Sequence, residues 1–329
     1  NEKQQMELVN EIVEARNFWE AWMSVRRNKG AAGIDKMSVD VLDVYMPLHM
    51  DEIKQSICRK QYKPSPVRRV FIPKPNGKQR PLGIPTVVDR VVQQATAQVL
   101  NRIYEPLFSE HSYGFRPNRS CHQAINQALD YLNAEYEWVV DFDIEKYFDT
   151  VNHDKLISIL REQVNDSATL HLIRSFLKSG VMEGGLVSAT TEGVPQGGCI
   201  SPILSNIYLD KLDKELESRE LRFVRYADDF DIFVKSERSA DRVMASVSRW
   251  LETKLRLKVS ATKTKVVRPT KSVFLGFTFW KSTRGWECRP TDAAKEKLET
   301  KVKQVLVRKR ATAQPMSYIF TKLNQVIRG

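Results

Sequence analysis

Three aspartates in two separate segments are the residues of this chain best suited to catalysis. Asp143 lies near the end of an apolar segment, and Asp228 and Asp229 follow 85 residues later between two runs of aromatic and β-branched residues. Three neighbouring carboxylates repel one another by roughly 1 kcal/mol per pair in water and by more at lower dielectric. Mg²⁺ would offset this repulsion, because it takes carboxylate oxygens together with substrate phosphates. Two such ions about 3.5 to 4 Å apart, with Mn²⁺ as an alternative, would support an in-line displacement at phosphorus.

The sequence gives little indication of a metal site built from His or Cys, or of disulfide bonds. The five histidines form no close pair in the sequence, and the four cysteines are separated by at least 63 residues. This spacing offers neither a zinc-type ligand pair nor a disulfide framework, so we expect reduced thiols. An isolated Asp-Asp pair on a turn is usually no more than solvated surface. The apolar runs on both sides of Asp228 and Asp229 argue against that interpretation here.

Two β elements must position the aspartates. In residues 138–144 the alternation of side chains places Val140, Phe142 and Ile144 on one face of a strand and Asp141 and Asp143 on the other. Residues 222–234 are typical of a hairpin with the Asp-Asp pair at its tip. We therefore expect the end of the strand and the tip of the hairpin to meet.

The rest of the chain mixes helical and strand patterns, which predicts an α+β fold. Residues 67–84 form two alternating runs around Pro75-Asn76-Gly77, and Asn-Gly favours a tight hairpin turn. Apolar spacing and capping residues predict helices at 3–27, at 87–104, after the cap Ser120, after the cap Ser201 with Pro202 in the first turn, and at about 291–310.

The charge of the chain is uneven. Lys and Arg number 52 against 40 Asp and Glu, which gives a net charge of +12 and a pI near 9.5. Residues 59–90 hold nine bases and one acid, residues 254–271 seven bases and no acid, and residues 295–329 nine bases and two acids. One such tract is usually a solvated face, but three with so few acids favour binding along a phosphate backbone.

No segment of the sequence is suited to a membrane. The longest uncharged run, residues 193–209, has seventeen positions and contains Pro, Gly, Ser, Asn and Gln. It is too short and too polar for a membrane-spanning helix. The chain begins at Asn1 without an initiator Met, and neither end has the basic-then-apolar layout of a secretion signal. We therefore expect a fragment of a cytoplasmic protein.

Three motifs, in order along the chain, resemble those of reverse transcriptases. Asp143-Ile144-Glu145-Lys146-Tyr147-Phe148 is similar to their first catalytic motif, an Asp followed five positions later by an aromatic residue. Tyr226-Ala227-Asp228-Asp229 is similar to their catalytic hairpin. Between these two, residues 193–202 resemble the segment that lies against the template and the incoming nucleotide.

Further segments narrow the resemblance to the group II intron-encoded reverse transcriptases, also called maturases. These segments are Arg80-Pro81-Leu82-Gly83-Ile84-Pro85-Thr86 with Asp89-Arg90, the run from His111 to Ser120, and the loop from Gly30 to Asp35. Together with the three motifs they extend the resemblance from about residue 15 to about residue 280.

The resemblance implies a right-hand polymerase. Its palm would be an antiparallel sheet backed by helices, and its fingers would combine helices with a β-hairpin. The implied division is fingers at 1–125, with an N-terminal loop at about 26–36 and a nucleotide-facing hairpin at 67–84, palm at 126–164, a fingers return segment at 165–190, palm at 191–290, and the start of a truncated thumb at 291–329.

The resemblance also implies roles for individual residues. Asp143, Asp228 and Asp229 would be catalytic and, with Ile144, would bind the metal ions. The residues that would contact the nucleotide are Arg68, Lys74, Arg80, Ile144, Phe148, Gln196, Gly197 and Lys263. Those that would contact nucleic acid are Arg26, Arg27, Lys29, Phe115, Arg116, Tyr226, Leu275 and Gly276, the last two in a primer-gripping hairpin at 274–279.

The chemistry of these side chains agrees with the implied roles. Lys74 and Arg80, with Arg68, would neutralise the charge of a triphosphate. Phe148 would clash with a 2′-hydroxyl and select deoxynucleotides; the alternative is that its ring anchors the following helix in the core. Lys263 would lie near the leaving phosphate, and the equally basic Lys265 is the alternative.

The hypothesis that follows is RNA-directed DNA synthesis by a group II intron protein that also binds its intron RNA to assist splicing and mobility. Its partners would be an RNA template with a DNA primer, deoxynucleoside triphosphates and the host intron RNA. The alternative is a splicing cofactor without a catalytic step, which would bind RNA through the same basic surface. The sequence does not indicate an oligomeric state.

Overall fold

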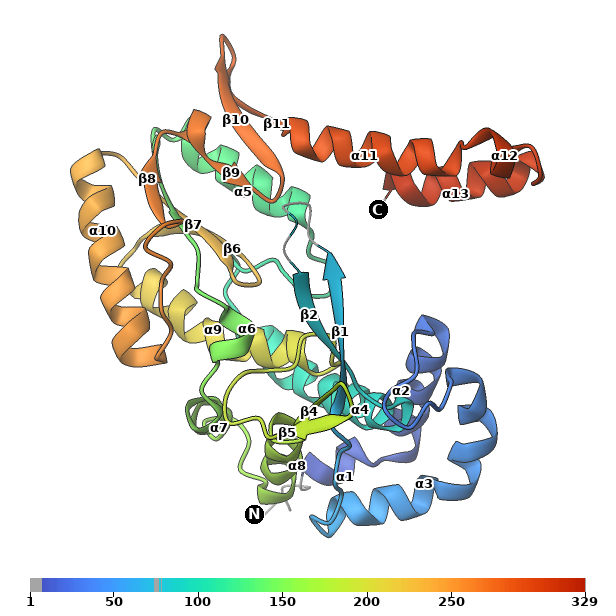
Figure 1. Ribbon diagram of the computed structural model, residues 1–329. Helices are drawn as coiled ribbons and strands as arrows, with labels where there is room; N and C mark the ends of the chain where they lie inside the picture. The colour runs from blue at the N-terminus through green and yellow to red at the C-terminus, as the bar shows by residue number, and fades with distance from the viewer. Residues whose placement is uncertain (1–7, 74–76, 78, 329) are drawn as a thin grey trace.

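The computed structural model describes residues 8–73, 77 and 79–328 and confirms the α+β fold (Figure 1). Its sheets have the strand orders β2-β1-β4-β5, β6-β7-β3-β8 and β11-β10-β9. The strands are β1 (Val67–Pro73), β2 (Gln79–Ile84), β3 (Trp138–Phe142), β4 (Val181–Glu183), β5 (Leu186–Ser188), β6 (Arg222–Tyr226), β7 (Asp229–Val234), β8 (Lys265–Val267), β9 (Val273–Phe274), β10 (Phe277–Ser282) and β11 (Gly285–Pro290). The helices are α1 (Leu8–Ile12), α2 (Ala15–Asn28), α3 (Leu42–Cys58), α4 (Val87–Tyr104), α5 (Cys121–Asn133), α6 (Tyr147–Thr150), α7 (His153–Leu160), α8 (Ser167–Leu177), α9 (Ser201–Ser218), α10 (Glu237–Trp250), α11 (Asp292–Val305), α12 (Arg308–Ala311) and α13 (Met316–Arg328).

The sheet β6-β7-β3-β8 is packed on both faces. On β3, Val140 belongs to the core on the side of α10, and its neighbour Val139 belongs to a second core on the side of α5. Both side chains are fully buried. In the first core the rings of Phe142 and Phe230 stack with their centroids 4.7 Å apart across the β3–β7 pair. This packing fixes the register of β3 against β7, because a slip of one residue would turn every buried side chain to the other face.

The hairpin expected at 67–84 is confirmed. β1 and β2 pair antiparallel in a register that places Ile72 opposite Arg80. The expected turn at Pro75-Asn76-Gly77 lies largely outside the described residues. β1 also pairs in parallel with β4, so the short β4–β5 hairpin at 181–188 lies beside the first hairpin in one sheet.

The helices expected at 87–104 and after Ser120 are confirmed as α4 and α5. The Thr86 hydroxyl caps α4 by accepting the backbone N–H of Asp89, and Ser120 with Gln123 forms a capping box at the start of α5. Capping of this kind satisfies N–H groups that have no partner within the helix, which is why the sequence marks both starts clearly.

The single helix expected at 3–27 is corrected by the structure. Residues 1–7 lie outside the described residues, and the chain then forms α1 and α2 with a break after Ile12. Glu14 explains the break, because its carboxylate accepts two N–H groups of the first turn of α2 and so caps a new helix. An apolar stripe continues across the break, and apolar spacing alone therefore did not reveal it.

Two further helix ends differ from expectation. Ser201 is the first residue of α9 rather than its cap, and its hydroxyl donates to the Pro195 carbonyl at 2.6 Å. The helix expected at 291–310 ends at Val305. The short α12 follows, and α13 returns alongside α11, so that these helices project from the body of the molecule (Figure 1).

Neither a membrane helix nor a disulfide occurs in the part of the chain that the structure describes. None of its helices is both long enough and apolar enough to cross a bilayer. All four cysteines are free.

Candidate active site

The β3–β7 register places the three aspartates together. Phe142 on β3 lies opposite Phe230 on β7, so the next residue, Asp143, follows at the level of Asp229. The β6–β7 hairpin closes with Tyr226 opposite Asp229, and Asp228 therefore lies in the turn between them. The negative charge of Asp143 thus helps to raise the pKa of Asp228 and of Asp229, although 85 residues separate Asp143 from Asp228 in the sequence.

The segment that leads into β8 holds Asp143 by its backbone. The N–H of Asp143 donates to the Thr264 hydroxyl at 3.2 Å, and its carbonyl accepts the N–H of Ser260 at 2.8 Å. The ammonium of Lys263 lies 3.0 Å from one carboxylate oxygen of Asp143. Lys265 pairs instead with Asp141 at 3.5 Å. Of the two lysines, Lys263 is therefore the one beside the predicted catalytic carboxylate.

Ile144 faces away from these carboxylates. Its side chain is 5% exposed and belongs to the large core, and its backbone forms an isolated bridge with Val259. Only the backbone of Ile144 could therefore take part in binding a metal ion or a nucleotide.

The two aspartates of the turn, Asp228 and Asp229, resist ionisation. Desolvation, followed by the negative charges of Asp228 and Asp143, raises the pKa of Asp229 to about 6. The pKa of Asp228 is also raised, mainly by desolvation, although the charge of Arg80 opposes the shift. Groups of like charge that destabilise one another in this way would be stabilised by a bound cation.

A divalent cation fits the charges of this site. The ammonium of Lys263 already places a positive charge beside Asp143, and the other two carboxylates are oxygen donors of the kind that hard cations prefer. As the side chains stand, no three His, Cys, Asp or Glu residues within 8–73, 77 and 79–328 are arranged to hold a metal ion.

We expect Mn²⁺ binding to this site to weaken as the pH falls through about 6, the pKa of Asp229. The metal binds the ionised carboxylate, so the apparent dissociation constant should rise by up to about tenfold per pH unit below that value. Electron paramagnetic resonance of free Mn²⁺ measures this. The charge of Lys263 lowers the Asp229 pKa, so Lys263→Gln should shift the transition to higher pH. An affinity independent of pH across this range would contradict the prediction.

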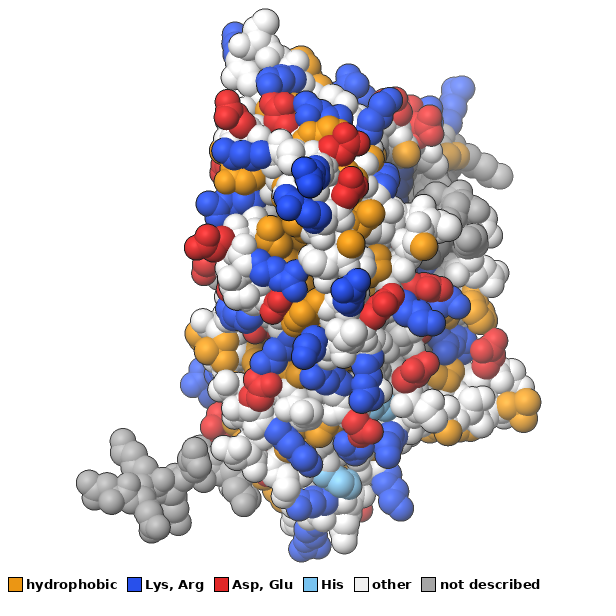
Figure 2. Space-filling model, turned by 90° about the vertical axis from the view of Figure 1, so that its left-hand side faces the viewer, with side chains coloured by type: hydrophobic (Ala, Val, Ile, Leu, Met, Phe, Trp, Pro, Cys, Tyr) orange, Lys and Arg blue, Asp and Glu red, His pale blue; other side chains and the backbone are white. Residues whose placement is uncertain are grey.

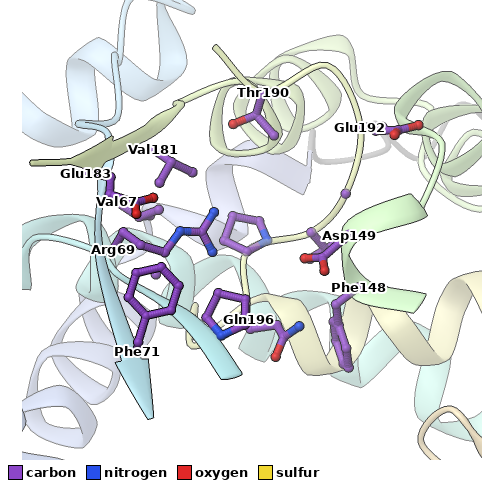
Figure 3. Close-up of a pocket in the computed structure, with 15 residues that line it drawn as sticks. Val67, Arg69, Phe71, Phe148, Asp149, Val181, Glu183, Thr190, Glu192 and Gln196 are labelled. Carbon is purple, nitrogen blue, oxygen red and sulfur yellow. The ribbon is translucent and has the colours of Figure 1, made fainter. Parts of the chain in front are cut away.

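The two neighbouring arginines of β1 face opposite sides of the hairpin. Arg68 donates to the Ala32 carbonyl from Nε at 3.0 Å and from Nη2 at 2.8 Å. Arg69 lines a cavity of about 420 Å³ together with Phe148 and Gln196, and Figure 3 shows Arg69 extending from β1 into it. Arg69 is thus a candidate nucleotide contact that our interpretation of the sequence missed. The alternation of β1 was the signal that could have found it.

Of the other two basic residues predicted to contact the nucleotide from this hairpin, the structure describes only Arg80. Arg80 lies on the face opposite to Arg69, and its positive charge lowers the pKa of Asp228. Lys74 lies outside the described residues. The hairpin therefore presents Arg80 to the aspartates and Arg69 to the cavity.

Gln196 and Gly197 lie against β2. The Gly83 N–H donates to the Gln196 carbonyl at 2.7 Å. Gly197 has φ +109°, and a Cβ there would lie 2.8 Å from the Gly83 carbonyl oxygen, so a larger residue would strain this contact. The half-buried Phe148 lies across the cavity from β1 (Figure 3). The backbone carbonyl of Phe148 accepts the Val194 N–H at 2.6 Å.

The predicted nucleic-acid contacts differ in exposure. Phe115 is 49% exposed, whereas Arg116 is 8% exposed, and its guanidinium bonds to Glu105 and to the carbonyls of Ser109 and Ser112. Arg116 therefore braces the loop from inside, and its guanidinium is turned away from any nucleic acid on the surface. Tyr226 is half-buried beside the turn that carries Asp228.

The other predicted contacts lie in the N-terminal loop and in the β9–β10 turn. Arg26 pairs with Asp43 at 2.7 Å, whereas Arg27 and Lys29 are exposed. Leu275 and Gly276 form the turn between β9 and β10, with φ values of 51° and 81°. The hairpin expected at 274–279 is thus present.

The basic side chains do not form a continuous patch on every face. Figure 2 shows the side of the molecule on which α10 lies, where Lys and Arg alternate with Asp and Glu. A mixed surface of this kind is typical of a solvated face. This view therefore gives no support to a nucleic-acid groove on the side of α10.

Comparison with known proteins decides the family. Residues 72–279 match the family described as "Reverse transcriptase (RNA-dependent DNA polymerase)". This chain is a member of the reverse transcriptase family. The fold and the enzyme class expected from its motifs are thereby confirmed, and reverse transcriptase domains in general use divalent metal ions.

This reverse transcriptase also has curated relatives. It is 35% identical over 290 residues to "Protein YkfC" of Escherichia coli (strain K12), with 76% of each protein covered. It is 39% identical over 209 residues to "Group II intron-encoded protein LtrA" of Lactococcus lactis subsp. cremoris, with 63% of this chain but only 35% of that protein covered. A chain of a solved "Partial Cas6-RT-Cas1--Cas2 complex" has a TM-score of 0.47 at 24% identity, over 76% of this chain and 43% of that chain. The curated relatives confirm the resemblance to group II intron proteins.

Proposed function

We propose that this reverse transcriptase copies RNA into DNA at the site of Asp143, Asp228 and Asp229, with two Mg²⁺ ions or with Mn²⁺ in their place. The observation that carries the proposal is the β3–β7 register, which brings Asp143 beside the Asp-Asp turn. When bound, the two ions would stabilise the negative charge on the attacking 3′-oxygen of the primer and on the departing pyrophosphate. Extension of a DNA primer on an RNA template with deoxynucleoside triphosphates tests the proposal. A folded protein that extends no primer under these conditions would refute it.

The residues of the chain would supply charge and position. Arg80, whose charge lowers the pKa of Asp228, would neutralise the triphosphate, and Lys263 would neutralise the leaving phosphate. Arg69 would contact the nucleotide from the cavity on the other face of the hairpin. Gly197 would let the backbone approach the new base pair closely, because it has no side chain. Gln196 would contact the nucleotide from the wall of the cavity that it shares with Phe148.

The division into fingers at 1–125 and 165–190, palm at 126–164 and 191–290, and thumb from 291–329 is part of this proposal. The parallel pairing of β1 with β4 supports it, because that pairing joins the two separate fingers segments. The pairing of β3 with β7 and β8 joins the two palm segments in the same way.

Changing Phe148 to Ala should admit ribonucleotides. The half-buried ring lines the cavity, and its removal opens space for a 2′-hydroxyl, so discrimination should fall by at least about tenfold. The ratio of kcat/KM for a deoxynucleotide and the matching ribonucleotide measures the effect. Unchanged discrimination together with a lower Tm would make Phe148 an anchor of the core instead.

A second candidate function, the binding of host intron RNA to assist splicing, is favoured by the rigid basic loop near the N-terminus. The guanidinium of Arg90 donates to the Lys29 carbonyl at 3.3 Å and to that of Ala31, and Arg68 holds the carbonyl of Ala32. These hydrogen bonds hold the main chain of the loop. The side chains of Arg27 and Lys29 remain exposed and could bind RNA phosphates. We propose that RNA binds at this loop. We also propose a location in the cytoplasm, which is supported by the four free thiols.

A further inference from the structure

A fully buried ion pair lies beneath the catalytic turn. Arg225 on β6 donates to both carboxylate oxygens of Asp213 on α9, at 2.7 Å from Nε and 2.6 Å from Nη2. Both side chains are 0% exposed. Desolvation of two charges is costly, and apolar residues of similar size often stabilise a core equally well. The pair therefore calls for an explanation other than stability.

The remaining nitrogen of the guanidinium reaches the turn itself. Nη1 of Arg225 donates to the carbonyl of Ala227 at 2.8 Å and to Oδ1 of Asn206 at 3.1 Å. Ala227 has φ 58°, a left-handed conformation that residues other than glycine rarely adopt. This carbonyl belongs to the peptide bond that leads into Asp228. Arg225 thus fixes the orientation of the backbone that carries the first carboxylate of the turn.

The same turn is held from a second side. Asn206 donates from Nδ2 to the Gly114 carbonyl at 2.9 Å, and a Cβ on Gly114 would lie 2.3 Å from the backbone nitrogen of Ala227. The segment that contains Gly114 also pairs with β6, because the N–H of Arg225 donates to the His111 carbonyl at 2.9 Å. The turn is therefore packed between this segment and the guanidinium.

We propose that Arg225 is a positioning residue, which with Asp213 and Asn206 aims the Asp228 carboxylate for binding of the divalent cation. This inference rests on the proposed function of the aspartates. Arg225 touches neither the metal nor the substrate in this role. It acts by holding the Ala227 carbonyl, and α9 in turn holds its guanidinium in a single orientation.

The test uses the double variant Arg225→Met, Asp213→Leu, which removes both charges and leaves no unpaired charge in the core. We expect its Tm to stay near that of the unaltered protein, its primer–template affinity to be unchanged, and its Mn²⁺ dissociation constant, measured by electron paramagnetic resonance, to rise by about ten- to a hundredfold. The kcat for primer extension should fall by a similar factor. A folded double variant with unaltered Mn²⁺ affinity would overturn the proposal.

Two further variants keep the test decisive. Arg225→Lys retains the charge, but a single ammonium cannot donate to both Asp213 and the Ala227 carbonyl, so Mn²⁺ binding should weaken severalfold. Unaltered binding in this variant would overturn the proposal even if the double variant does not fold. Arg219→Met with Glu215→Leu removes an ion pair of 2.6 Å at the end of the same helix, away from the turn, and should change none of these values. The Mn²⁺ measurement separates failure of this inference from failure of the proposed function, which primer extension by the unaltered protein tests.

Discussion

Changing Asp228 to Asn is expected to lower the rate of primer extension by at least about a thousandfold, because several kcal/mol of charge stabilisation in the transition state are lost with one of the proposed metal ligands. The variant should fold, since it relieves the repulsion that raises the pKa of Asp229. Single-turnover extension of a labelled primer measures the rate. Fluorescence anisotropy of the same primer–template should show unchanged binding.

Asp141→Asn is the matched control for this loss. Asp141 lies on β3 two residues before Asp143, and its charge also acts on Asp229, but its own carboxylate pairs with Lys265. Removing it changes the local charge by the same amount and leaves the three proposed ligands in place. Extension should therefore stay within about threefold of the unaltered rate. Equal losses in both variants would show that the net charge of the region matters and that Asp228 is no metal ligand.

The affinity for RNA is expected to fall by about a thousandfold or more between 50 and 200 mM salt, if six or more phosphates are contacted. The physical reason is the release of counterions from the nucleic acid when Lys and Arg neutralise its phosphates. The three basic tracts, with 25 bases and three acids in all, provide enough positive charge for such a footprint. A titration at several salt concentrations gives the slope of log affinity against log salt.

A variant of the N-terminal loop locates part of this footprint. Changing the exposed Arg27 and Lys29 to Gln should lower the slope by about one for each phosphate that these side chains no longer neutralise. Changing Arg238, an exposed residue of α10, to Gln is the control and should leave the slope unaltered. If the loop variant has the same slope as the unaltered protein, the loop does not bind RNA phosphates.

Local patterns predicted most of the elements that carry the site. The hairpin 67–84 and the starts of α4 and α5 are confirmed because turn residues and capping residues act within a few positions of themselves. The break after Ile12 was missed, because Glu14 caps a new helix without interrupting the apolar stripe. The end of α11 was missed as well, since nothing in its basic sequence marks a stop at Val305.

Individual contacts were harder to predict than elements. Arg68 and Arg69 are adjacent and chemically identical, yet the first holds the Ala32 carbonyl and the second lines the cavity. Arg116 was expected to contact nucleic acid, and its side chain is buried against Glu105. In each case the orientation of the side chain depends on a segment that lies elsewhere in the sequence.

The sequence by itself determined the chemical groups of this reverse transcriptase and the strand and hairpin that carry them, because residue type, alternation and turn propensity are local properties. Only the tertiary structure decided the register that places Asp143 at the level of Asp229, the position of Lys263 rather than Lys265 beside Asp143, and the burial of the Arg225 guanidinium beneath the turn. These facts depend on which strands pair, in which register, and on which helix packs below them. Such long-range choices are made by the burial of apolar side chains throughout the fold, and no short stretch of sequence contains them.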